Sequence, residues 1–398
     1  MVGMMEAQGR QVIPPVSIGP GEFRARVAAL QRRLVHDAID VAVVTDAANV
    51  AYFCGYRPEH FFLTRSRTLV LLIPATGEPK IVAPASHLQD VSEQTGLGGI
   101  AGYQGLRAAP VAQIATAIAE LGARRVGLEL GFEHRINLTI DDLDRLRDLL
   151  RPGTCLADVA DAVWSLRLAK SPAELALIEH ACGIAAAALD AALPRLRPGI
   201  TERQLAGHVA AEVALQGGQV AALILTSGSG SYHRGNGAPR ARPIAAGELV
   251  FVDLIVSYEG YHADFNRNMV AGAPTAEQQA LQDRVLAVTE GAARYLLPGV
   301  PVAEVYARVL GACRGAGLRL EPPGRVGHGL GLGITEPPHV AADDPTVLAE
   351  GMVLTIEPAI ERVDGLYCAE IVYAVTPDGG RSLSGAGSAL LSAHGAGG

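Results

Sequence analysis

The sequence lacks the features that would place it in several common protein classes. Its 398 residues carry a net charge of −8 and no dense basic stripe, which argues against a nucleic-acid-binding protein. Arg, Gly or Pro interrupts the longest apolar stretches, so we expect no membrane span. No basic region followed by an apolar segment stands at the start, and we therefore expect no signal peptide. A phosphate loop, a dinucleotide fingerprint and a solenoid-length repeat are also missing.

Cysteine is scarce as well, with five residues at scattered positions and no CxxC pair. This pattern predicts reduced, mostly buried thiols in a cytoplasmic protein rather than a disulfide framework. Hydrophobic residues make up 49% of the chain and charged residues 19%, a balance that permits a large core. The length suits two or three domains.

The apolar periodicity changes near the middle of the chain. Strand patterns alternate with helix patterns over residues 21–165, which predicts an α/β domain preceded by a Gly/Pro-rich flexible leader over 1–20. We place the boundary near Trp164 to Lys170 and assign residues 166–398 to a second, α+β domain. The elements expected there are helices capped by Ser171, Thr201 and Thr275, a strand pair at Val353–Ile360 and Leu366–Val375, and a frayed end over 379–398.

Carboxylates within apolar strands mark the chemistry of the second domain. Asp253 follows the apolar run Leu249–Val252, and Asp264 lies eleven residues later on the returning strand of a hairpin that turns at Glu259-Gly260. A hairpin of this kind brings two carboxylates close together. Buried carboxylates repel each other and lose hydration, so something must neutralise them, and a metal ion is the best candidate.

Three further residues complete a predicted ligand set of four carboxylates and one imidazole. His328 lies in a glycine-dense segment whose small residues allow close approach of a ligand or metal. Glu357 ends one apolar strand and Glu370 lies within another, where an unpaired charge is costly. Oxygen-rich ligation with a single imidazole suits two divalent ions, with Mn²⁺ preferred and Co²⁺, Zn²⁺ or Fe²⁺ as alternatives. Such ions polarise a carbonyl group and lower the pKa of water, which is the chemistry of hydrolysis.

The order and spacing of these five residues resemble those of peptidase family M24, the superfamily of creatinase, aminopeptidase P and prolidase with the pita-bread fold. Residues 43–55 are similar to the start of a creatinase-like N-terminal domain, and residues 164–174 are similar to the family's domain junction. The resemblance covers nearly the whole chain. It implies a homodimer in which the N-terminal domain contributes to the partner's active site.

The resemblance also implies a role for each site residue. Asp253 would bind one metal, His328 and Glu357 the other, and Asp264 and Glu370 would bridge the two. Glu357 would also handle the proton during catalysis. A histidine in the loop before the first aspartate faces substrate in the family, and His233 matches that position here.

One position departs from the family pattern. Peptidases of this family carry a second histidine seven residues after the metal histidine, where this chain has Thr335. Threonine can donate a hydrogen bond but carries no positive charge, so it would stabilise a tetrahedral intermediate less well. We expect Thr335, Glu336 and His339 to contact substrate, with packing of Glu336 against Pro337 as the alternative. Arg65 lies in a basic–aromatic cluster of the N-terminal domain that is otherwise expected to be a solvated loop. The resemblance makes Arg65 a further candidate, since an arginine there could bind a substrate carboxylate bidentately.

Three functions are consistent with this sequence. The first is a metal-dependent hydrolase that cleaves the C–N amide bond of small Xaa-Pro peptides. The second, prompted by Thr335, uses the same metals on a small non-peptide zwitterion, in the manner of dimethylsulfoniopropionate lyase or ectoine hydrolase. The third is a binding protein without catalysis, which we disfavour because such a protein has no physical need for five buried ligands. Metal-free creatinase chemistry is disfavoured for the same reason.

Overall fold

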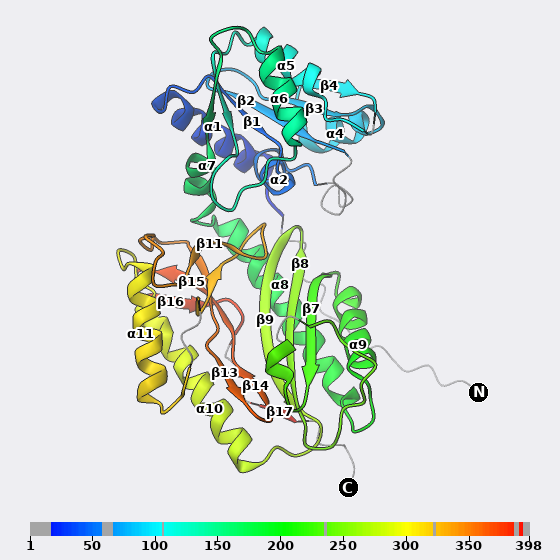
Figure 1. Cartoon of the computed structure of the whole chain (residues 1–398), viewed down its shortest axis with the longest axis vertical. Coiled ribbons are helices and arrows are strands. Elements are labelled where there is room, and N and C mark those ends of the chain that lie inside the picture. Colours follow the sequence, from blue (N-terminus) through cyan, green and yellow to red (C-terminus); the bar gives the residue numbers. More distant parts are fainter. Residues whose placement is uncertain are drawn as a thin grey trace, which may run out of the picture.

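The computed structural model describes residues 17–57, 67–105, 107–234, 237–320, 324–385 and 390–392. Figure 1 shows two halves along the long axis, with the N-terminal half above and the C-terminal half below. The predicted leader falls largely outside the described residues, and the first helix begins at Pro20.

One mixed sheet with strand order β4-β3-β2-β1-β5-β6 forms the N-terminal half. Side chains of β1 alternate between two cores: Val41 and Val43 pack with α5 and α6, whereas Ala42 and Val44 pack with α1, α2 and α7. Helices on both faces of the sheet confirm the predicted α/β class. The strands are β1 (Val41–Val44), β2 (Val70–Pro74), β3 (Lys80–Pro84), β4 (Gly99–Tyr103), β5 (Arg125–Leu128) and β6 (Cys155–Asp158). The helices are α1 (Pro20–His36), α2 (Ala47–Cys54), α4 (Leu88–Thr95), α5 (Val111–Glu120), α6 (Ile140–Leu149) and α7 (Ala160–Arg167).

Two curved sheets and a small strand pair form the inner part of the C-terminal half. The first sheet has the order β17-β9-β8-β7 and the second β11-β10-β12-β15-β16, while β13 pairs only with β14. The strands of the first are β7 (Gln219–Ser227), β8 (Leu249–Tyr258), β9 (Tyr261–Val270) and β17 (Leu391–Ser392). The others are β10 (His328–Gly329), β11 (Glu336–His339), β12 (Val353–Ile356), β13 (Ala359–Arg362), β14 (Gly365–Cys368), β15 (Ile371–Thr376) and β16 (Gly379–Ser382).

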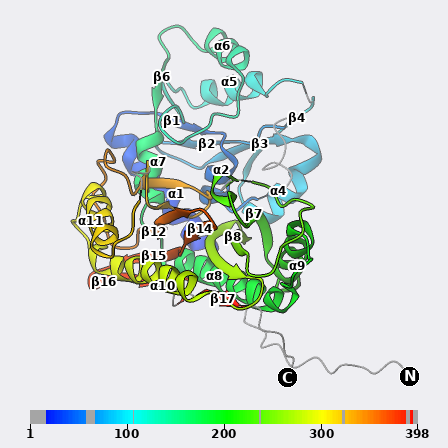
Figure 2. The same ribbon diagram turned by 60° about the horizontal axis from the view of Figure 1, so that its bottom comes forward.

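Four helices cover the outer faces of these sheets, as Figure 2 shows. Apolar side chains of α8 and α9 pack on β7–β9, and those of α10 and α11 pack on β12 and β15. Capping boxes begin at Ser171, Thr201 and Thr275, which confirms the three predicted caps. The helices are α8 (Pro172–Ala192), α9 (Glu202–Leu215), α10 (Ala276–Gly291) and α11 (Val302–Gly315). This arrangement confirms the predicted pita-bread fold.

Helix α8 and its short extension are long and apolar enough to cross a membrane by length and composition, the only such segment among the described residues. Half of its most apolar stretch is buried inside the protein, however. Its apolar residues pack against both the N-terminal half and the sheet of β7–β9. These contacts are typical of a core helix.

A single apolar cluster joins the two halves. Leu30 and Phe53 from the N-terminal half share it with Leu177 of α8, Ala263 of β9 and Leu332. The N-terminal half is therefore packed directly onto the strands that carry the predicted ligands. The boundary predicted near Trp164 to Lys170 covers the end of α7 and the start of the link to α8, and the exact domain limits stay a prediction.

The predicted fraying of residues 379–398 is wrong where that segment is described. β16 pairs with β15, and β17 pairs in parallel with β9. A side chain at Gly380 would come within 2.9 Å of Leu296, so glycine permits β16 to lie close to the helices. Composition alone misled the prediction, because here the glycines serve close packing rather than flexibility.

The glycines around His328 pack against protein backbone and side chains. A Cβ at Gly327 would lie 2.0 Å from the Thr355 carbonyl oxygen, and one at Gly329 would lie 2.3 Å from the Pro337 carbonyl oxygen. The sequence predicts that these small residues allow close approach of a ligand or metal, whereas the groups that approach them in the structure are neighbouring strands. These contacts set the place of His328 within its sheet.

Replacing Gly327 with alanine should destabilise the fold by at least ~3 kcal/mol, because the new methyl group meets a backbone carbonyl that cannot move aside. Chemical denaturation of the variant and the wild type measures the difference. Gly324→Ala is the matched control, since a Cβ there meets nothing within 4 Å. Equal stabilities of the two variants would contradict the close packing at Gly327.

Glu129 is a buried carboxyl group at the end of β5. It accepts hydrogen bonds from the backbone N–H of Thr45 at 2.7 Å and of Asp46 at 3.0 Å, and from the Asn49 amide at 2.5 Å. Burial is the largest cause that raises its pKa to about 7, and the nearby Asp46 charge adds to it. The folded protein therefore holds a proton here that the unfolded chain releases at lower pH.

A pH-dependent difference in stability should follow from Glu129. The pKa of Glu129 in the folded protein lies above the ordinary value of 4.5. The protonated Glu129 therefore contributes fully to stability below pH 4.5, and this contribution is lost as the pH rises towards about 7. Glu129→Gln cannot titrate, so the stability deficit of the variant should shrink by on the order of 3 kcal/mol between pH 4.5 and pH 7.5. Urea denaturation across this range tests it, and a constant deficit would mean that Glu129 stays ionised.

Candidate metal centre

The hairpin of β8 and β9 presents two carboxylates on the inner face of its sheet. The apolar neighbours of Asp253 along β8 belong to the core beneath α8 and α9, so Asp253 faces the opposite way. The strand register pairs Asp253 with Asn266 and Asp264 with Ile255. The two aspartates are therefore diagonal neighbours on one face, rather than a directly opposed pair. The backbone turns at Glu259 and Gly260 with φ of 49° and 79°, as predicted.

His328 supplies an imidazole from β10 in the second sheet. Its Nδ1 lies 2.9 Å from the Gly329 carbonyl oxygen, which can only accept, so Nδ1 carries the hydrogen and Nε2 the lone pair. Nε2 lies 3.5 Å from Asp264 Oδ2 and 3.5 Å from Glu357 Oε1. A backbone contact that orients the ring in this way is typical of a metal-binding histidine.

Glu357 and Glu370 lie where two paired strands are both interrupted. β12 and β15 pair up to Ile356 and Ile371, and the pairing resumes in β13 and β14. Pro358 has no N–H to donate, which accounts for the interruption on one side. The predicted strand pair is thus correct in its pairing but discontinuous. The discontinuity places both carboxylates beside the aspartates.

These side chains form one cluster of oxygen and nitrogen donors. One ligand atom each from Asp264, His328 and Glu370 lies within 4.8 Å of the other two, and all three residues are buried. Buried oxygen atoms of Asp253, Asp264 and Glu370 have no hydrogen-bond partner within the described part of the chain. Unpaired carboxylate oxygens around one imidazole are the donors that a divalent cation satisfies. The residues present therefore fit the metal ions that the sequence predicts.

The metal-free cluster is electrostatically unfavourable. Burial and the neighbouring carboxylates raise the pKa of Asp264 and of Glu370 well above the usual range, and burial raises the pKa of Asp253. Burial and the Asp253 charge raise the pKa of Glu357 to about 7. Burial lowers the pKa of His328 to about 4, so its ring is neutral near pH 7. A neutral imidazole is the form that binds a metal.

The remaining predicted site residues differ in how far the structure describes them. His233 is exposed on the short helix η3 (Ser231–Arg234), which contacts β14 and so lies near the strand that leads to Glu370. Thr335 is half-buried just before β11. Arg65 falls outside the described residues. Catalytic or substrate-binding roles for these three residues stay predictions.

His339 is engaged on both sides of its ring. Arg325 donates to Nδ1 at 3.2 Å, and Glu133 of the N-terminal half lies 3.3 Å from Nε2. The ring of Phe132 packs edge-on against it at 5.8 Å between centroids. His339 therefore orients Arg325 through Nδ1, while Nε2 lies near Glu133 without a hydrogen-bond partner among the described residues. A substrate contact by His339 stays a prediction.

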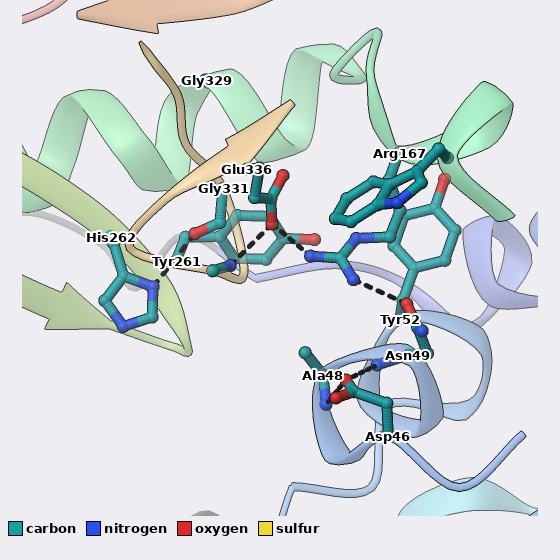
Figure 3. A network of polar contacts seen from close by, with 12 residues as sticks. Asp46, Ala48, Asn49, Tyr52, Arg167, Tyr261, His262, Gly329, Gly331 and Glu336 are labelled. Carbon is teal, nitrogen blue, oxygen red and sulfur yellow. Dashed lines mark hydrogen bonds and ion pairs between the residues drawn. The ribbon is translucent and has the colours of Figure 1, made fainter. Parts of the chain in front are cut away.

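Glu336 is also occupied by protein groups, which argues against the predicted substrate contact. The residue is 1% exposed, and its side chain forms ion pairs with Arg167 and, at 3.4 Å, with Lys170. The Gly333 N–H donates to the same carboxylate at 2.6 Å. Figure 3 shows Arg167 between Glu336 and Asn49. The alternative, packing of Glu336 against Pro337, does not account for these contacts either.

Sequence reasoning missed three cations that contact or influence the predicted site residues. Arg167 and Lys170 lie in the segment that identified the domain junction, but their partner Glu336 is far away in the sequence. Arg325 lies three residues before His328. Burial raises the pKa of Asp264 and of Glu357, and the positive charge of Arg325 partly opposes that rise. The sequence signal that could have identified Arg325 is its position next to the glycine-dense segment around His328. A lone exposed arginine in a loop is otherwise read as a surface residue.

Comparison with known proteins identifies the family of this arrangement. A family model described as metallopeptidase family M24 matches residues 176–383, which include all five residues of the cluster. The chain belongs to metallopeptidase family M24. A second model, described as the creatinase/prolidase N-terminal domain, matches residues 26–169. Family membership implies divalent metal ions, in agreement with the donor set.

Relatives of the chain include peptidases of bacteria and archaea. An uncharacterised peptidase of Staphylococcus saprophyticus is 27% identical over 366 residues, which cover 90% of this chain and 99% of the relative. An Xaa-Pro dipeptidase of Pyrococcus horikoshii is 33% identical over 232 residues, 57% of this chain and 65% of that one. The solved Xaa-Pro dipeptidase of Bacillus anthracis has the same fold, with a TM-score of 0.80 at 23% identity over 93% of this chain and 99% of that chain.

Proposed function

We propose that this M24 metallopeptidase hydrolyses the amide bond of small Xaa-Pro peptides with two divalent metal ions, Mn²⁺ being preferred. The observation that carries the proposal is the cluster of buried, unpaired carboxylate oxygens around the neutral imidazole of His328. Asp253, Asp264, His328, Glu357 and Glu370 would hold the ions. When bound, such ions supply Lewis-acid polarisation of the scissile carbonyl and a lower pKa for the attacking water.

Glu357 is suited to move the proton in this reaction. The Thr355 hydroxyl lies 3.4 Å from Glu357 Oε1 and orients the carboxylate. Glu357 would take a proton from the attacking water and deliver it to the leaving amine.

Three residues are proposed to hold the substrate. Arg325, oriented by His339, would bind the carboxylate of a short peptide from the rim of the cluster. His233 would position the substrate, and Thr335 would donate a neutral hydrogen bond to its carbonyl oxygen. The proposal also includes a cytoplasmic homodimer whose N-terminal domain, with Arg65, contributes to the partner's site. Nucleic acids and membranes are not proposed partners.

The neutral Thr335 favours a second candidate function. A site without the second imidazole stabilises the intermediate of amide hydrolysis less well. The same metals would then act on a small zwitterion, by elimination or by hydrolysis, and Arg325 would hold its carboxylate.

Metal analysis and a substrate panel test these proposals. We expect purified protein to bind about two Mn²⁺ per chain and to release proline from Xaa-Pro dipeptides, with no release after chelation. Metal-loaded protein that cleaves none of the dipeptides would favour the zwitterion. Protein that binds no divalent ion would contradict both functions.

A further inference from the structure

The segment between His328 and Glu336 is held from its far end by a buried ion pair. Glu336, Arg167 and Lys170 are 1%, 5% and 6% exposed. Glu336 accepts from Arg167 Nη2 and, at 2.6 Å, from the Gly333 N–H, so the carboxylate ties the segment to α7. The indole ring of Trp164 lies 4.5 Å from the Arg167 guanidinium and covers it.

Arg167 extends this contact into the N-terminal half. Its Nη1 donates to Asn49 Oδ1 at 2.6 Å, while Nη2 donates to Glu336. Since arginine can only donate, the oxygen of Asn49 faces Arg167 and its amide nitrogen donates to Glu129 at 2.5 Å. One guanidinium thus bridges α2 of the N-terminal half and β11 of the C-terminal half, as Figure 3 shows.

The near end of the segment is tied to the strand that carries Asp264. The backbone N–H of His262 donates to the Gly331 carbonyl oxygen at 2.8 Å, and His262 Nδ1 lies 3.1 Å from the same oxygen. A Cβ at Gly331 would come within 2.9 Å of Glu336 Oε2 and 3.0 Å of Lys170 Cε. The segment is therefore packed between the ion pair and β9. Its contact on β9 is His262, two residues before the proposed metal ligand Asp264.

We propose that Arg167, acting through Glu336, is a positioning residue that places the Gly331–Thr335 segment against the metal cluster. The expected effect on substrate binding rests on the proposed function, in which Thr335 at the end of this segment donates a hydrogen bond to the substrate. The planar fork of arginine donates to two acceptors in fixed directions, whereas lysine presents one flexible ammonium group. Arg167→Lys therefore keeps the charge of the ion pair but cannot reproduce the bridge.

A purely structural ion pair would behave differently, and Arg26 provides the matched control. Arg26 is 6% exposed at the same junction, and its contacts include the Tyr52 carbonyl oxygen, Glu22, Glu174 and, at 3.4 Å, the hydroxyl of Tyr261, the neighbour of His262. None of these groups belongs to the Gly331–Thr335 segment. Arg26→Lys should lower stability much as Arg167→Lys does, without moving the segment.

Hydrogen exchange and kinetics on the Mn²⁺-loaded full chain test the proposal. Exchange of residues 329–336 should accelerate at least about tenfold in Arg167→Lys and stay unchanged in Arg26→Lys. KM for an Xaa-Pro dipeptide should rise about tenfold or more in Arg167→Lys alone, with kcat within about threefold of wild type. Asn49→Ala, which keeps the ion pair but removes the bridge, should show the same pattern if Arg167→Lys does not fold.

The outcomes separate this inference from the proposed function. Wild-type protein that cleaves no Xaa-Pro peptide contradicts the proposed function, but the exchange of residues 329–336 still decides the placement of the segment. Unchanged exchange and KM in both Arg167→Lys and Asn49→Ala would overturn the inference. Equal changes in Arg26→Lys would overturn it as well, because they would show that any loss of stability at this junction has the same effect.

Discussion

Without metal, Asp264→Asn should be more stable than the wild type, and it should gain almost nothing from added Mn²⁺. Asp264 is 6% exposed, and burial and neighbouring carboxylates hold its pKa well above the usual range. At neutral pH the metal-free wild type must therefore bury a repelled charge or bind a proton, and both lower its stability. Asparagine has nearly the same shape without the charge, so it removes this cost together with a metal ligand.

Thermal unfolding with and without Mn²⁺ measures both effects. At a metal concentration of about 1,000 times Kd, the wild type should gain about 4 kcal/mol, and Asp264→Asn should gain far less. Asp142→Asn is the matched control. Asp142 is 5% exposed in the capping box of α6, so this variant should lose stability in both states and keep the full response to metal. A metal response in Asp264→Asn equal to that of the control would refute the proposed ligand.

Thr335→His should raise kcat/KM on Xaa-Pro dipeptides by about ten- to a thousandfold. A protonated imidazole donates a charged hydrogen bond to the oxygen that becomes negative in the transition state, whereas a threonine hydroxyl donates a neutral one. Thr335 is half-buried just before β11, where the family carries its second histidine. The measurement is steady-state hydrolysis of a dipeptide panel by Mn²⁺-loaded wild type and variant.

Thr335→Asn separates charge from hydrogen bonding. Asparagine donates a neutral hydrogen bond and cannot be protonated, so its kcat/KM should stay close to that of the wild type. If Thr335→His and Thr335→Asn have equal activity, the missing charge at position 335 does not limit peptide hydrolysis. A gain in Thr335→His only at pH values where its imidazole is protonated would support the physical reason most directly.

Much of the fold could be predicted because its signals are local. Ser171, Thr201 and Thr275 each bond the backbone three residues ahead, so the helix starts can be read from neighbouring letters. The hairpin turn at Glu259-Gly260 is equally local. That β16 and β17 form strands could not be predicted. Their pairing with β15 and β9 overrides a glycine-rich composition that favours flexibility.

The proposed ligands were found because buried charge is conspicuous in an apolar strand. Asp253 interrupts a continuous apolar run, Asp264 lies between Ala263 and Phe265, and Glu357 and Glu370 end or interrupt apolar strands. The structure brings them together with His328, and metal binding itself stays a prediction. The ion pairs of Glu336 with Arg167 and Lys170 could not be predicted, because nothing beside Glu336 in the sequence indicates them.

The sequence by itself determined the family pattern, the helix caps, the hairpin and the five residues of the proposed metal cluster. Each of these depends on a residue and its near neighbours, or on the cost of burying a charge. Only the tertiary structure decided that Glu336 pairs with Arg167 and Lys170, and that His339 lies between Arg325 and Glu133. The physical reason is distance along the chain: the ion pair between Arg167 and Glu336 and the contact between Glu133 and His339 form only once the two halves have packed together.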